Sequence, residues 1–164
     1  MPSVVERADQ PYLSIPVTVT MRTVSEAADR LPDLLQWAAS RGIVPAGPPF
    51  LKYDVIDTAG ELRVRVGFPV GDGVPDEFLP DGVVAGVLPG GRYVSTVHTG
   101  HPATLVEVTR DLLEWAAIEG LRWDVTPTDA GEAWGARLEV FLTDPRVERN
   151  IEKWQTELLL RLAD

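Results

Sequence analysis

Alternation of apolar and polar side chains along several short segments predicts β-strands. The clearest pair is Pro49–Ile56 and Glu61–Phe68, which are separated by Asp57-Thr58-Ala59-Gly60. A short link of this composition is typical of a β-hairpin. The same reasoning predicts further strands, with the fifth only a possible one and the fourth Leu-rich enough to suit a helix as well. These segments are Tyr12–Thr20, Arg92–His98, Trp134–Leu142, Thr156–Leu162 and Val83–Leu88.

Two other segments have a helical pattern and nearly the same sequence. Asp33–Gly42 and Asp111–Gly120 are identical at seven of ten positions, at an offset of 78 residues. Leucine, tryptophan and alanine recur in both at the spacing of one helix face, and the final glycine suits a C-cap. Such a match predicts two tandem copies of one supersecondary unit.

The sequence also carries signals for where the helices begin. Thr23 and Glu26 have the spacing of a capping box ahead of the first helix, and Pro102 suits the first position of the second. Pro32 is expected either to kink the first helix or to begin a new segment.

Each copy therefore reads as strand, helix, strand, strand, and this regularity favours a strand for Thr156–Leu162. We expect a single domain over residues 1–164, with copy one at about 11–70, a connecting loop at about 71–91 and copy two at about 92–164. The predicted fold class is α+β, with pseudo-twofold symmetry, antiparallel sheets and two main helices flanking a central groove. A groove between structural units is a natural ligand site.

Composition removes several classes of function. The 15 Lys and Arg against 25 Asp and Glu give a net charge of −10, which argues against direct nucleic-acid binding. The absence of cysteine excludes disulfides, thiolate metal sites and cysteine nucleophiles. His98 and His101 have no carboxylate beside them, so we expect no metal and no cofactor. With no signal peptide and no apolar run near the ~18 residues of a membrane span, the sequence predicts a cytoplasmic protein without a membrane partner.

No common catalytic motif is present, but one carboxylate stands out. Strand alternation places Glu139 on the same face as Arg137 and Phe141. If this face lies over the groove, burial disfavours the charged carboxylate, and a cationic ligand would offset that cost. The alternative is a solvated face on which Glu139 pairs with Arg137, or with Arg63 or Arg65 of a neighbouring strand.

Aromatic side chains could form the walls of the groove by stacking and cation–π contact. The two tryptophans at matching repeat positions either face each other across the pseudo-axis or fill equivalent core positions. The candidate wall residues, each also compatible with a core position, are Trp37, Tyr53, Phe68, Tyr93, Trp115, Trp123, Trp134 and Phe141.

Four spaced motifs follow one another in order, namely Val66–Val70, Leu88–Tyr93, His98–Gly100 and Leu138–Pro145. Together they resemble the GyrI-like effector-binding family, which also forms the ligand domain of AraC-type and MerR-type regulators. The resemblance implies a tandem duplication with a groove that binds lipophilic, often cationic, aromatic compounds, and it makes Glu139 the central acid. Phe141 stands where a tyrosine is common in the family. The regulators' helix-turn-helix half has no counterpart in the short N-terminal stretch.

Three functions follow from the resemblance and the residues. The first is binding of hydrophobic, often cationic aromatic molecules for multidrug-type sensing or sequestration, with Glu139 as the negative charge. The second is hydrolysis of cyclopropane-bearing electrophilic compounds, with Glu139 as acid/base and Tyr93 as its hydrogen-bond partner. The third and least favoured is a gyrase-inhibitor-like protein interaction through an acidic surface, for which the sequence shows no localised acidic stripe. The sequence does not indicate an oligomeric state.

Overall fold

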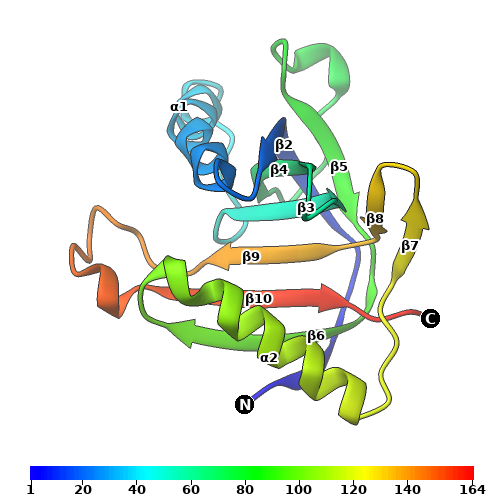
Figure 1. The fold of residues 1–164 in the computed structure, drawn as a ribbon. Coiled ribbons are helices and arrows are strands. Elements are labelled where there is room, and N and C mark those ends of the chain that lie inside the picture. Colours follow the sequence, from blue (N-terminus) through cyan, green and yellow to red (C-terminus); the bar gives the residue numbers. More distant parts are fainter.

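The computed structural model describes residues 1–164 and has one curled antiparallel sheet with two α-helices, an α+β fold (Figure 1). A hairpin of β7 (Val125–Thr128) and β8 (Gly131–Trp134) is attached to the sheet through β3. The other strands lie in the order β1 (Ser3–Arg7), β6 (Gly91–Thr99), β10 (Gln155–Arg161), β9 (Arg137–Phe141), β3 (Phe50–Ile56), β4 (Glu61–Pro69), β2 (Gln10–Thr20) and β5 (Val84–Leu88).

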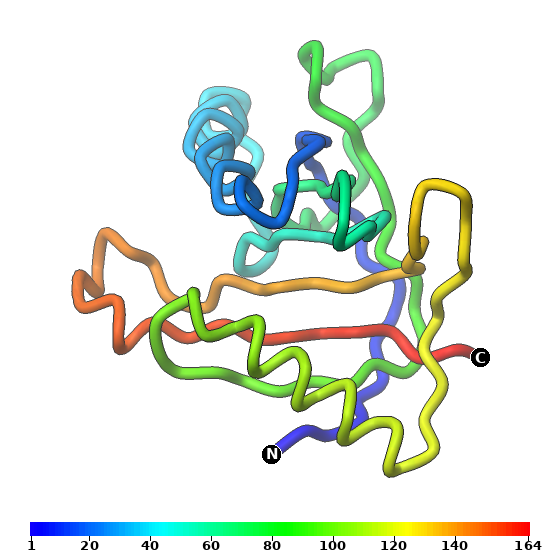
Figure 2. Tube along the Cα trace, viewed as in Figure 1, coloured from blue at the N-terminus to red at the C-terminus, as the bar shows by residue number.

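The chain connections require the sheet to curl. β1 and β6 lie at one end of the strand order and β2 and β5 at the other. Only Ala8 and Asp9 separate β1 from β2, and only Pro89 and Gly90 separate β5 from β6. Two linking residues span at most about 11 Å between the flanking Cα atoms, so the two ends of the sheet must approach each other. Figure 2 shows β1 and β2 as one continuous run from one end of the sheet to the other.

The two helices are α1 (Leu31–Ser40) and α2 (Leu105–Ile118). Each follows a 3-10 turn, Val24–Arg30 before α1 and Pro102–Thr104 before α2. Pro102, expected at the first position of the second helix, instead opens the 3-10 turn that leads into it. Pro32 lies in the first turn of α1, where its missing N–H costs nothing, so it begins a segment rather than kinking one. Neither helix has the length and apolar composition that crossing a membrane would take.

Both helices end in the same way, as the repeated sequence predicts. Gly42 and Gly120 have φ values of 72° and 71°, the left-handed conformation that glycine adopts most readily. The N–H of the next residue, Ile43 or Leu121, donates to Ala38 O or Ala116 O at 2.9 Å. This is the Schellman arrangement, and it satisfies carbonyls that the helix end would otherwise leave free.

The expected capping box does not form. The Thr23 hydroxyl accepts a hydrogen bond from the N–H of Thr20 at 2.9 Å and makes no bond to a helix amide. Thr23 therefore closes the turn after β2, and its carbonyl accepts from the Glu26 N–H at 2.9 Å in the 3-10 turn that follows.

The expected strand Trp134–Leu142 is divided into β8 and β9 by Gly135 and Ala136. Gly135 packs so tightly against Asp124 that an added Cβ would lie 1.7 Å from its carboxylate. Asp124 is itself held by Arg161 at 2.8 Å. At Gly135 this close contact with Asp124 takes the place of pairing between strands. The β7–β8 hairpin lies outside the main strand order of the sheet.

Buried apolar side chains form two clusters, one on each face of the sheet. The larger lies between the sheet and the helices and includes Leu34 and Leu112 with Leu51, Val66 and Leu158. The smaller lies on the opposite face; its members are Tyr12, Phe50, Leu88, Tyr93, Ala136, Leu138, Val140 and Leu159. Its residues come from both ends of the sheet, which agrees with the curl.

Candidate functional site

Glu139 lies at the middle of the helix-bearing face. In the register of the sheet it stands between Leu51 of β3 and Leu158 of β10, both members of the larger cluster. α1 contacts β4 and α2 contacts β6, so β10, β9 and β3 run between the two helices (Figure 1). The carboxylate therefore comes from the central strand of the strip that separates the helices.

Tyr53 of β3 donates its hydroxyl hydrogen to Glu139 Oε1. Burial raises the pKa of Tyr53 well above its ordinary value of 10.0, and the adjacent carboxylate adds to that rise, so Tyr53 remains a donor. Burial also raises the pKa of Glu139 above 4.5, against the opposing effects of the Tyr53 hydrogen bond and the charge of Arg137. Glu139 is thus a desolvated acid, and one of its oxygens accepts a hydrogen bond from the neutral hydroxyl of Tyr53.

Arg137 lies two residues before Glu139 and on the same face. Its guanidinium carbon is 4.7 Å from the centroid of the Trp134 ring and 5.8 Å from that of Tyr53. None of the six ion pairs of the structure includes Arg137 or Glu139. Burial lowers the pKa of Arg137, partly offset by Tyr53, Glu139 and Glu132. A positive and a negative group therefore share this site without pairing to each other.

Most of the expected aromatic residues lie on this face. Trp134 is 7% exposed and packs against Trp123 at 5.8 Å between centroids. Trp123, also one of the aromatic residues expected near the groove, follows directly after the second helix in the sequence. The half-buried members that pack against the larger cluster are Trp37 of α1, Trp115 of α2, Tyr53 and Phe141.

Two expected site residues lie elsewhere. Phe68 is 0% exposed inside the larger cluster, which makes it a core residue. Tyr93 belongs to the smaller cluster on the opposite face, and its hydroxyl donates to Pro89 O at 2.5 Å. Burial raises the pKa of Tyr93 to about 12. Because the sheet separates it from Glu139, Tyr93 is neither a wall of this site nor a partner of the acid.

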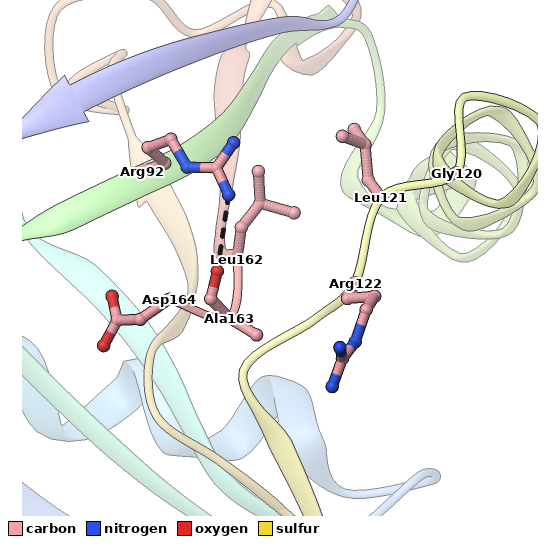
Figure 3. A pocket seen from close by; sticks show the side chains of 7 residues that line it. All are labelled: Arg92, Gly120, Leu121, Arg122, Leu162, Ala163 and Asp164. Carbon is pink, nitrogen blue, oxygen red and sulfur yellow. Dashed lines mark hydrogen bonds between the residues drawn. The ribbon is translucent and has the colours of Figure 1, made fainter.

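Two shallow surface cavities lie away from Glu139. One, of about 250 Å³, is lined by apolar residues of β2 and β5 with Val70 and Val74. The other, of about 210 Å³, lies beside the C-terminal residues Leu162–Asp164. In Figure 3 Arg92 and Arg122 lie on opposite sides of this cavity, and Arg92 donates to Ala163 O at 3.4 Å. No group of three or more candidate metal ligands occurs anywhere in the structure.

The family model of the GyrI-like small molecule binding domain matches residues 1–163. The chain belongs to this family. The motifs in the sequence had indicated the same family, and the curled antiparallel sheet with two helices is the fold in which this GyrI-like chain presents Glu139. No curated protein sequence matches the chain.

Solved structures of similar fold cover the whole GyrI-like chain at low sequence identity. EcmrR in its DNA complex has a TM-score of 0.78 and 15% identity, and the match covers 100% of this chain and 57% of EcmrR. SAV2435 bound to tetraphenylphosphonium has a TM-score of 0.66 and 9% identity, with 99% and 94% covered. A hydrolase from Listeria innocua has a TM-score of 0.62 and 17% identity, with 99% and 91% covered. The chain thus spans little more than half the length of EcmrR.

Proposed function

We propose that this chain binds hydrophobic aromatic small molecules, cationic ones among them, beside Glu139 on the helix-bearing face. Such binding would serve multidrug-type sensing or sequestration. The observation that carries the proposal is the state of Glu139, which is half-buried, outside every ion pair and hydrogen-bonded through one oxygen to Tyr53. A carboxylate in this position gains from a ligand that brings a positive charge or a donor. That SAV2435 has been solved with tetraphenylphosphonium supports this class of ligand.

The spacing of the helices supports a groove at this place. From β6 to β4 there are four strand spacings, about 19 Å, because neighbouring strands lie ~4.8 Å apart. A helix with its side chains is about 10 Å across, so helices on β6 and β4 leave a strip roughly 9 Å wide. That width suits an aromatic ring system. Its floor would be Glu139 with Tyr53, and its walls would include Trp37 and Trp115.

The strand order also supports a duplicated unit of about 11–70 and 92–164 within a single domain. Outward from the central β9–β3 pair, the next strands of the sheet are β10 and then β6 on the β9 side, and β4 and then β2 on the β3 side. The corresponding strands of the two expected copies therefore occupy corresponding places. We infer a pseudo-twofold axis between β9 and β3, which puts Glu139 next to the axis. With a net charge of −10, we expect no direct contact of this domain with nucleic acid.

Fluorescence titration with tetraphenylphosphonium and with neutral triphenylphosphine oxide tests the proposal. The Glu139→Gln variant should weaken binding of the cation at least about tenfold, because a desolvated charge pair is lost, and should change binding of the neutral compound by less than about twofold. Glu61→Gln, which removes an exposed carboxylate from β4, is the matched control. Equal loss of both compounds in Glu139→Gln, or no loss of either, would overturn the proposal.

Hydrolysis of cyclopropane-bearing electrophiles is a second candidate, favoured by the Tyr53–Glu139 hydrogen bond. An acid whose pKa is raised can exchange a proton with water or substrate, and Tyr53 supplies the hydroxyl that Phe141 lacks. Incubation with such an electrophile, followed by mass spectrometry, should show many product molecules per protein if this candidate is right. Product that stops at one equivalent, or turnover that survives Glu139→Gln, would exclude it.

A further inference from the structure

Resting on the proposed function, we propose that the Glu139 site selects bipolar aromatic molecules, which carry a carboxylate or similar anionic acceptor as well as a cationic group. Arg137 would bind the acceptor and Glu139 the cation. The site would then prefer a zwitterion to a simple lipophilic cation of the same shape.

Arg137 is half-buried and has no carboxylate partner. The buried and half-buried cations elsewhere in the sheet are paired: Lys52 and Arg65 with Asp54, and Arg161 with Asp124 at 2.8 Å. The side chain of Arg137 also makes no hydrogen bond to protein, although burial lowers its pKa. A buried charge without a partner is costly, and a guanidinium pairs best with a carboxylate, which it can hold with two parallel hydrogen bonds.

Arg137 also disfavours a ligand that carries only a positive charge. Its guanidinium already lies over the rings of Trp134 and Tyr53, the surfaces on which an aromatic cation would stack. A simple cation bound to Glu139 would be close to this like charge in a desolvated strip. A ligand carboxylate turns that repulsion into attraction.

The geometry suits two charges on one ligand. Arg137 and Glu139 are two residues apart on one strand, so their Cα atoms are separated by about 7 Å. A ring system with opposite charges at its two ends has a comparable separation.

Rhodamine B and its methyl ester form a matched pair of probes, because the acid is a zwitterion at neutral pH and the ester a cation on the same ring system. The wild-type protein should bind the zwitterion about tenfold more tightly than the ester, as expected for one charge-assisted pair. Arg137→Gln should remove or reverse this preference, chiefly by weakening the zwitterion. Arg137→Lys keeps the positive charge but lacks the planar guanidinium that can form two parallel hydrogen bonds, so it should retain part of the preference for the zwitterion. Arg63→Gln, an exposed arginine of β4, should leave it unchanged.

The outcomes separate this inference from the proposed function. If Glu139→Gln weakens the ester but the preference is absent in wild type or survives in a folded Arg137→Gln, the bipolar selection is wrong and the proposed function stands. If neither dye binds to wild type, or Glu139→Gln affects neither, both fail. Circular dichroism of each variant establishes folding, and Arg137→Lys decides the matter if Arg137→Gln does not fold.

Discussion

The two faces of the sheet hold their buried charges in different ways. On the face opposite the helices, Asp54 accepts hydrogen bonds from Lys52 and, at 2.7 Å, from Arg65. On the helix-bearing face, Glu139 has only the neutral hydroxyl of Tyr53, and Arg137 has only ring faces. The first arrangement is complete within the protein, whereas in the second neither charge forms a direct ion pair.

Under the proposed function, the face opposite the helices is structural and the helix-bearing face binds the ligand. A satisfied ion cluster stabilises the fold only when all its members are present, and it has little left to offer a ligand. An unsatisfied acid and base on a central strand raise the energy of the free protein and lower it again when a ligand pairs with them. Substitutions on the first face should therefore affect stability, and those on the second should affect binding.

The largest stability effect is expected for Asp54→Ala. It leaves Lys52, whose side chain is 9% exposed, without its counter-charge, and Arg65 loses the same partner. Because Asp54 itself is 24% exposed, we expect a loss of about 2–3 kcal/mol in the free energy of unfolding, below the full value for a buried pair. Urea denaturation measures this, with Asp72→Ala in the exposed 71–83 loop as control. Ligand affinity should stay within about twofold, and a tenfold change would contradict the division between the faces.

Tyr53→Phe should have an intermediate effect on stability and a distinct effect on pH dependence. Removing the donor to a buried carboxylate should cost about 1–2 kcal/mol. Since the hydrogen bond lowers the pKa of Glu139, its loss raises that pKa further, and binding of cations should begin only at higher pH. A binding titration across pH measures the shift.

Tyr93→Phe is the matched control for that experiment, because it removes a buried tyrosine hydroxyl from the other face. It should lower stability by about 1 kcal/mol and leave the pH dependence of binding where it is in wild type. If the two variants shift the profile alike, the Tyr53 hydrogen bond does not control Glu139.

The smallest effect is expected for Glu139→Gln on stability, within about 1 kcal/mol near neutral pH, and its sign depends on pH. Burial raises the folded-state pKa of Glu139 above 4.5, so the folded protein holds this proton more tightly than the unfolded chain. The resulting stability is fully present below pH 4.5 and is lost as pH rises through the folded-state value. Wild type should therefore lose stability relative to Glu139→Gln over that window in parallel urea denaturations. A rise instead of a fall would mean that Glu139 is stabilised as a carboxylate.

Regular patterns in the sequence were enough to predict most elements. Both helices and the hairpin at residues 57–60 are confirmed, because they rest on local spacing and on turn chemistry. The missed elements carry little local signal. β1 is mostly exposed and has charged residues at its end, and its strand character comes from pairing with β6, about ninety positions along the chain.

The candidate site was predictable only along its own strand. Alternation alone predicts that Arg137, Glu139 and Phe141 share one face of their strand, and the register of β9 agrees. The face on which Tyr93 lies could not be predicted in this way. Tyr93 and its neighbour Val94 point to opposite faces of the sheet, and both are buried, at 2% and 0% exposed. Alternation therefore does not show which of the two faces the helices. Nor could the partner of Glu139 be read from spacing, since Tyr53 is 86 residues away.

By itself the sequence determined the family, the helical repeat and the one acid set among apolar and aromatic neighbours. These features depend on residue types and on how apolar positions repeat, every two residues in a strand and every 3.6 residues in a helix. Such patterns are local and can be read from one segment of the chain. Only the tertiary structure decided that Tyr53 meets Glu139, that Arg137 meets two rings instead of a carboxylate, and that Tyr93 lies behind the sheet. Those facts depend on which strands pair and in what register, and a shift of one residue would move every side chain of a strand to the other face.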